Sequence, residues 1–240
     1  TALSDAVKWG YVARNVCDLV DPPRVQAMEM HPPVPADLAG LLDAAKEDRW
    51  LSLWTLAVYT GARQGELLGL QWQDVDLVAG TITIQRTLLQ TTRAGVPDYA
   101  PPKTARSRRT VTLPGEAVAS LAAHRLRQLE QRLALGAEYT DYGLVFATAT
   151  GTPLGYRNVV RAFKVALGRA DLPATIRFHD LRHAAATTML QVGVPLKVAS
   201  ERLGHSNIGI TADLYTHAVA SMEADAAARL ETAIRGKAAS

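Results

Sequence analysis

Cysteine is almost absent from this chain of 240 residues, which contains only Cys17. A single cysteine excludes an internal disulfide and a cysteine-rich zinc site. No apolar run approaches the roughly 18 residues that suggest a transmembrane helix. The first residues also lack the basic-then-apolar layout of an export signal. We therefore expect a cytoplasmic protein that makes no contact with a membrane.

A strong charge of either sign is absent as well, since 26 basic residues face 23 acidic ones and the net charge is +3. The distribution is uneven: residues 1–60 hold 5 basic and 8 acidic residues, whereas residues 61–240 hold 21 and 15. This modest basic excess is compatible with a nucleic-acid partner and decides nothing alone. With 48% hydrophobic residues, the chain can bury an ordinary globular core.

Prolines are concentrated in one early stretch, at Pro22, Pro23, Pro32, Pro33 and Pro35. Such density disfavours both helix and regular strand, so residues 21–36 are predicted to be a linker. Residues 1–20 have apolar positions spaced for one helical face and are interpreted as the last helix of an upstream domain. Residues 37–240 form the main predicted domain.

Helical periodicity dominates this domain. We expect helices over residues 37–60, 116–135, 156–170, 179–192, 195–203, 208–217 and 219–235, with a further helical turn after Gly61. Short strands are expected at residues 81–87, 109–113 and 144–147, and the loop between the first two is long and basic. The fold class is therefore α+β, mainly helical with a small antiparallel sheet.

Residues suited to phosphate chemistry recur in the same domain. His179 and Arg182 are three residues apart on one expected helix and share a face. Arg63 begins a helix just after Gly61, where the backbone can approach a ligand closely. The remaining candidates are Lys103 in the basic loop, His205 in a loop between helices, and Tyr215 ten residues later.

These residue types fit attack on a phosphodiester. Two arginines can clamp the non-bridging oxygens by bidentate hydrogen bonds without a metal. A lysine, with a pKa of about 10.4, is protonated at neutral pH and can protonate the leaving oxygen. A tyrosine hydroxyl, with a pKa of about 10, needs help to ionise, and either His179 or His205 can give it.

Four segments resemble, in order and spacing, the signature of the tyrosine recombinases, the phage-integrase family: TGARQGELLGLQWQDVD, PPKTARSRRTVTLP, HDLRH and LGHSNIGITADLYTH. The resemblance begins near Val34. It implies catalytic roles for Arg63, Lys103, His179, Arg182, His205 and Tyr215, with Tyr215 as the nucleophile that forms a 3′-phosphotyrosyl bond. No cofactor or metal is implied.

The resemblance also implies partners. Double-stranded DNA recombination sites are the expected substrate, in the bacterial nucleoid, and accessory DNA-bending proteins are further candidates. A homotetramer on DNA is expected to form by exchange of the C-terminal helix 219–235. Arg106, Arg108 and Arg109 are interpreted as contacts to DNA phosphates.

Other interpretations compete with this one. Taken singly, Arg63 fits an ordinary ion pair and Tyr215 a core tyrosine, while Glu66 and Asp74 suit structural roles that fix Arg63 or cap a helix. His183 and His217 suit packing. His179 and His183, with His205 as a third ligand, resemble a zinc hydrolase site. A type IB topoisomerase shares the chemistry of the set, and a non-catalytic DNA-binding protein could share its fold.

Overall fold

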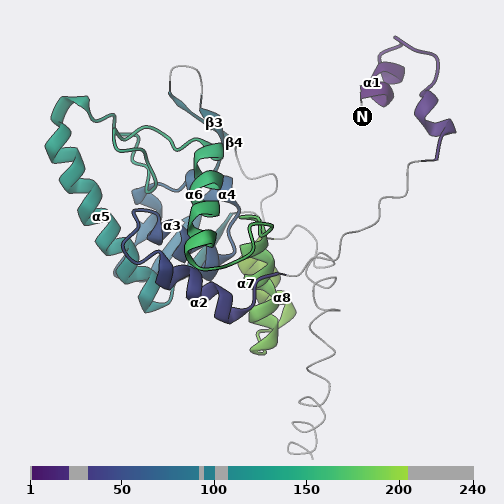
Figure 1. Cartoon of the computed structure of the whole chain (residues 1–240). Helices are drawn as coiled ribbons and strands as arrows, with labels where there is room; N and C mark the ends of the chain where they lie inside the picture. Colours follow the sequence, from purple (N-terminus) through teal and green to yellow (C-terminus); the bar gives the residue numbers. More distant parts are fainter. Residues whose placement is uncertain (1, 22–31, 92–94, 101–107, 205–240) are drawn as a thin grey trace, which may run out of the picture. The chain divides into compact units, whose positions relative to one another are not determined.

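The computed structural model describes residues 2–21, 32–91, 95–100 and 108–204, and its chain divides into two compact units, Thr1–His31 and Pro32–Ser240 (Figure 1). In the first unit, α1 spans Ala2–Lys8 and the 3-10 helix η1 spans Val16–Leu19, and neither has a buried residue. The helix predicted over residues 1–20 is therefore too long. It ends before Gly10, whose φ of 77° is incompatible with a right-handed helix.

The second unit begins with two helices where the sequence predicted one. Helix α2 (Pro35–Ala44) has proline in its first turn, and the Asp37 carboxylate accepts a hydrogen bond from the Val34 amide at 2.9 Å. Helix α3 (Leu51–Thr60) follows a turn in which the Asp48 side chain accepts from the Trp50 amide. The continuous helix 37–60 is thus wrong, because Asp48 makes a local side-chain turn there.

Helix α3 lies at the centre of the core. Eight of its ten residues are buried, and it contacts both α5 (Gly115–Leu135) and α7 (Asp180–Gln191). Trp54 packs its ring against Trp50, Phe163 and Phe178, with ring centroids 5.4–5.9 Å apart. Burial on nearly every side explains why this helix has no charged residue and why its apolar residues are not confined to one stripe.

Two small antiparallel sheets lie beside the helices. Strands β1 (Val75–Asp76), β2 (Thr81–Ile84) and β5 (Arg109–Thr112) form one, in the order β1-β2-β5. A second consists of β3 (Thr87–Thr91) and β4 (Pro97–Ala100). The strand predicted over residues 81–87 therefore ends at Ile84, because the side chains of Gln85 and Arg86 both turn to bind Asp74.

The later helices agree with the sequence prediction to within a residue at each end: α5, α6 (Tyr156–Arg169), α7 and α8 (Leu196–Leu203). The predicted strand 144–147 is reduced to isolated bridges, from Leu144 to Gln71 and from Ala147 to Pro153. Helices 208–217 and 219–235 lie outside the described residues. A mainly helical fold with small antiparallel sheets is confirmed (Figure 1). In the described ranges no helix is long and apolar enough to span a membrane.

Candidate active site

The turn from α3 into α4 (Gln64–Leu68) places Arg63 and is packed tightly against α7 and α8. Gly61 ends α3 with a left-handed φ of 59°. A β-carbon at Gly61 would lie 2.4 Å from a methyl group of Leu203 and 3.3 Å from Ala185. Glycine is required there both for the backbone angle and for the close approach, so the turn is fixed relative to the two later helices.

Arg63 is held by its own helix. The Glu66 carboxylate accepts from the Arg63 backbone amide and from its Nη1, both at 2.9 Å. The Arg63 side chain is 42% exposed, whereas that of Glu66 is 4% exposed. The guanidinium is therefore anchored on its buried side and accessible on the other. The structural role predicted for Glu66 is confirmed, as is that of Asp74, whose carboxylate accepts from the Gln71 amide and binds Arg86.

Arg109 lies behind Glu66 and is buried. Its Nη2 is 2.8 Å from Glu66 Oε2, and its Nε donates to the Arg202 carbonyl at 2.8 Å. Burial alone raises the pKa of Glu66, but the hydrogen bond and charge of Arg109, with those of Arg63, outweigh it and hold the pKa below its usual value. The carboxylate is thus ionised between two cations.

This geometry corrects the interpretation of Arg109 as a contact to DNA phosphate, because its side chain is only 6% exposed and is committed to Glu66. The sequence did carry a signal for it. Arg109 is in phase with Val111 on β5 and with Leu113 directly after the strand, and period-two alternation predicts that all three face the same, buried side. Arg108, out of phase, is exposed. Arg106 lies outside the described residues.

The end of α8 packs against Arg109. Gly204 has a left-handed φ of 68°, and a β-carbon there would lie 2.6 Å from Arg109 Nη1. The Gly204 carbonyl is 3.5 Å from Arg63 Nη2. Arg202 fixes this segment further by donating to the carbonyls of Tyr59 and Thr112. The residue that follows, His205, lies outside the described part of the chain.

Arg182 is the second cation of the site and is nearly fully buried, at 4% exposure. Its Nη1 donates to the Gly61 carbonyl at 2.7 Å, and its buried Nη2 has no hydrogen-bond partner among the described residues. Burial, followed by the charge of Arg63, lowers the pKa of Arg182 to about 9. The group is still a cation at neutral pH. An anion bound beside it would raise its pKa again, because the negative charge favours the protonated guanidinium.

Two histidines stand at the start of α7. The rings of His179 and His183 meet edge to face with centroids 5.0 Å apart. Burial lowers the pKa of each ring, and the charge of Arg182 lowers both further. Both imidazoles are therefore neutral at pH 7, and a neutral imidazole can accept a proton.

The zinc alternative is not favoured by this arrangement. The carboxylate of Asp180, which lies between the two histidines in sequence, is bound by the Arg177 amide and guanidinium at 2.8 Å. Arg182, moreover, places a fixed cation beside both rings.

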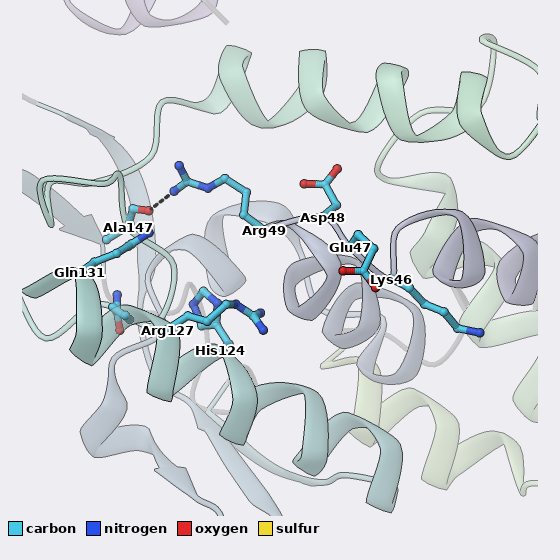
Figure 2. A pocket seen from close by; sticks show the side chains of 9 residues that line it. Lys46, Glu47, Asp48, Arg49, His124, Arg127, Gln131 and Ala147 are labelled. Carbon is cyan, nitrogen blue, oxygen red and sulfur yellow. Dashed lines mark hydrogen bonds between the residues drawn. The ribbon is translucent and has the colours of Figure 1, made fainter.

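The structure thus brings Arg63, which immediately precedes α4, together with His179 and Arg182 at the start of α7, more than a hundred residues later in the sequence. Lys103, His205 and Tyr215 lie outside the described residues. A pocket of about 260 Å³ elsewhere, between the turn at residues 46–49 and α5, is lined by none of the predicted site residues (Figure 2).

Comparison with known proteins agrees with this fold. Residues 35–222 match the model of the phage integrase family. The chain is 37% identical to a XerC-like tyrosine recombinase of Caldanaerobacter subterraneus, over 94% of this chain and 62% of the relative. It is 28% identical to an integrase of Saccharopolyspora erythraea, over 97% of this chain and 64% of the relative.

Solved structures share the fold. The Tn1549 transposon integrase in complex with transposon right end DNA has a TM-score of 0.68 at 22% identity, with 88% of this chain and 70% of that chain covered. The XerA recombinase has a TM-score of 0.65 at 23% identity, covering 85% and 66%. This chain therefore belongs to the phage integrase family, whose members include tyrosine recombinases. It spans less than two thirds of the length of the two sequence relatives named above.

Proposed function

We propose that the protein is a site-specific DNA recombinase that cuts and rejoins strands through a covalent bond to Tyr215. The observation that carries the proposal is the pair of arginines on the α3–α4 turn and α7. Arg182 is buried and its Nη2 has no hydrogen-bond partner among the described residues, and Arg63 is anchored by Glu66 with its other side accessible. Such a pair is suited to the two non-bridging oxygens of one phosphate.

The reaction follows from these groups. As the Tyr215 oxygen attacks phosphorus, negative charge grows on the non-bridging oxygens and is stabilised by Arg63 and Arg182. The bond to the 5′ oxygen breaks, and protonated Lys103 supplies the proton that this oxygen needs to leave. A 5′-hydroxyl from a partner strand then attacks the phosphotyrosine and restores Tyr215. The phosphodiester energy is conserved, so no nucleotide cofactor is consumed.

The proton from Tyr215 needs an acceptor. His179 and His205 are the two proposed groups. The lowered pKa of His179, caused first by burial, favours a neutral ring that can take this proton at pH 7. His183 packs against His179 and is proposed to orient it.

The proposed partners are duplex recombination sites and three further copies of the protein, with accessory DNA-bending proteins as an additional expectation. An apolar groove of about 280 Å³ between α2, α3 and α7 supports exchange of helix 219–235. It is lined by Leu38, Leu42, Val58, Ala185 and Met189, among others. The apolar positions of residues 219–235 are the natural complement: Ala220, Ala224, Ala227, Leu230 and Ile234. A place of action at bacterial DNA follows from this proposal.

The test is covalent attachment to DNA. DNA fragments that remain bound to the full-length protein under denaturing conditions are sequenced, and the recovered site is rebuilt as a nicked suicide substrate. Tyr215→Phe is expected to abolish the covalent band and to leave DNA binding unchanged. Tyr11→Phe, which alters an exposed tyrosine of the first unit, is the matched control. A covalent band that survives in Tyr215→Phe would overturn the assignment, and relaxation of any supercoiled DNA without strand exchange would indicate a topoisomerase.

A further inference from the structure

Helix α5 carries an apolar stripe that faces solvent. Its members are spaced alternately three and four residues apart: Ala119, Ala122, Leu126, Leu129 and Leu133. All five are exposed, and the leucines are exposed by 60%, 46% and 83% in chain order. Alternating three- and four-residue spacing is the a/d pattern of a helix that packs along a second helix.

A different face of α5 packs on the domain. Ala117 and Leu121 are buried, and His124 and Gln128 bond to the carbonyls of Val145 and Leu144 at 2.7 and 3.0 Å. At about 100° per residue, the centre of the stripe lies roughly 140° around the helix from these residues. Figure 2 shows other α5 side chains, including His124, beside the pocket next to residues 46–49. The stripe is therefore not the core face of α5, and within the described ranges it stays exposed.

The charges beside the stripe point to what covers it. Arg125 and Arg132 follow one edge, and Glu130 lies on the other. Both arginines are held there, Arg125 with its guanidinium carbon 5.2 Å from the Trp72 ring centroid and Arg132 by an ion pair with Asp141 at 2.7 Å. When two copies of this helix pair in parallel, the arginine edge of one lies against the Glu130 edge of the other. When they pair antiparallel, the two arginine edges lie together, and so do the two Glu130 edges.

We propose that α5 is a dimerisation helix that pairs in parallel with α5 of a second copy of this chain. The leucines of the two stripes interlock, and Arg125 of each subunit pairs with Glu130 of the partner subunit. Antiparallel pairing would instead oppose arginine edges. Because three leucines and two alanines per subunit form a small interface, the dimer is reversible and depends on concentration. It needs no DNA, so its test is independent of the strand-transfer chemistry.

Sedimentation of the purified 240-residue chain without DNA, over a range of concentrations, tests the proposal. A monomer–dimer equilibrium is expected, and Leu129→Glu should raise the dimer dissociation constant by about tenfold or more. Gln131→Glu adds the same charge to an exposed position off the stripe and should leave the constant unchanged. A chain that stays monomeric, or a dimer that Leu129→Glu does not weaken, overturns the proposal.

The parallel direction has its own test. In a Cys17→Ser background, the thiol introduced by Leu133→Cys should form an intersubunit disulfide under mild oxidation, because parallel stripes bring identical positions together. Glu130→Arg should weaken the dimer, and adding Arg125→Glu should restore it. A dimer without this disulfide contradicts the parallel arrangement. If the chain is a monomer and its introduced thiol does not react with a soluble thiol reagent, residues 205–240 cover the stripe instead of a second copy. That result would overturn the proposed dimer.

Discussion

The Glu66 carboxylate and the Arg109 guanidinium form a buried ion pair, with 2.8 Å between Oε2 and Nη2 and side-chain exposures of 4% and 6%. The same carboxylate holds Arg63, whose outer side is accessible. Arg109 also binds the Arg202 carbonyl, just before the turn that leads to His205. Through Glu66, one buried arginine thus connects the half-exposed Arg63 with the end of α8, so we expect it to position both.

Arg109→Ala should cost about 3–5 kcal/mol of unfolding free energy, because it leaves the buried Glu66 charge unpaired. Urea unfolding followed by circular dichroism measures this. The exposed neighbour provides the control, since Arg108→Ala should change stability by no more than about 0.5 kcal/mol.

A double variant separates stability from positioning. Arg109→Met with Glu66→Gln removes both buried charges and should recover much of the lost stability. Cleavage should stay low, because glutamine carries no charge to hold the Arg63 guanidinium. A double variant that cleaves at the wild-type rate would contradict the positioning role.

Gly204→Ala should destabilise the protein and slow cleavage. The left-handed φ of 68° disfavours a side chain there, and the new methyl carbon would lie 2.6 Å from Arg109 Nη1. We expect a loss of about 1–3 kcal/mol from strain and displacement together. Gly168→Ala is the matched control: this glycine lies inside α6 with open space around it, so alanine should stabilise by about 0.5–1 kcal/mol. Thermal unfolding of the two variants compares them directly, and equal effects would contradict the argument.

The histidine pair predicts a pH dependence of stability. Burial lowers the folded-state pKa of His179 and His183 below 6.5, the ordinary value that the unfolded chain retains. The unfolded state therefore binds protons first. The histidine contribution to stability is fully present above pH 6.5 and is lost as the pH falls toward the folded-state pKa.

Unfolding free energies measured from about pH 7.5 to about pH 5, a range that spans the ordinary histidine pKa of roughly 6.5, should show this decline. The variant His183→Asn should flatten it. Resonances of the two rings give a second measurement. If NMR shows both rings titrating above the ordinary value, the assignment of two neutral imidazoles is contradicted.

How much the sequence predicted depended on the kind of signal. Helices α5 and α6 were placed to within a residue because their periodicity is strong and glycine or proline marks where they begin. The break between α2 and α3 was missed because residues 45–50 contain neither glycine nor proline, and the turn depends on the Asp48 side chain. The β3–β4 pairing was also missed, since a basic loop with Pro97 resembles irregular chain.

The same difference between strong and weak sequence signals applies to the candidate site. The positions of Arg63, His179 and Arg182 followed from motifs, and the structure brings the three together. The burial of Arg109 was missed because Arg106, Arg108 and Arg109 were interpreted together as contacts to DNA phosphates. The alternation of β5 separates Arg109 from exposed Arg108, and only pairing with β2 fixes which face is buried.

Arg182→Lys should lower the cleavage rate by about 10³-fold or more, by analogy with positioned arginines in phosphoryl transfer. Lysine keeps a cation but cannot donate to the Gly61 carbonyl and present a second planar donor to phosphate at once. Single-turnover cleavage of the suicide substrate measures the loss, with circular dichroism to confirm folding. The control is Arg108→Lys, which changes an exposed arginine directly before β5. A rate within tenfold of wild type would remove Arg182 from the phosphate clamp.

Lys103 is predicted to be the general acid, and its test depends on the leaving group. With a normal phosphodiester, Lys103→Ala should cleave slowly because the departing 5′ oxygen lacks a proton donor. A substrate with sulfur at the bridging 5′ position releases a thiolate that needs no proton, so cleavage by Lys103→Ala should recover toward the wild-type rate. Arg182→Ala should not recover with the same substrate, because the charge on the non-bridging oxygens is still unneutralised. Recovery in both variants, or in neither, would show that Lys103 does not protonate the leaving oxygen.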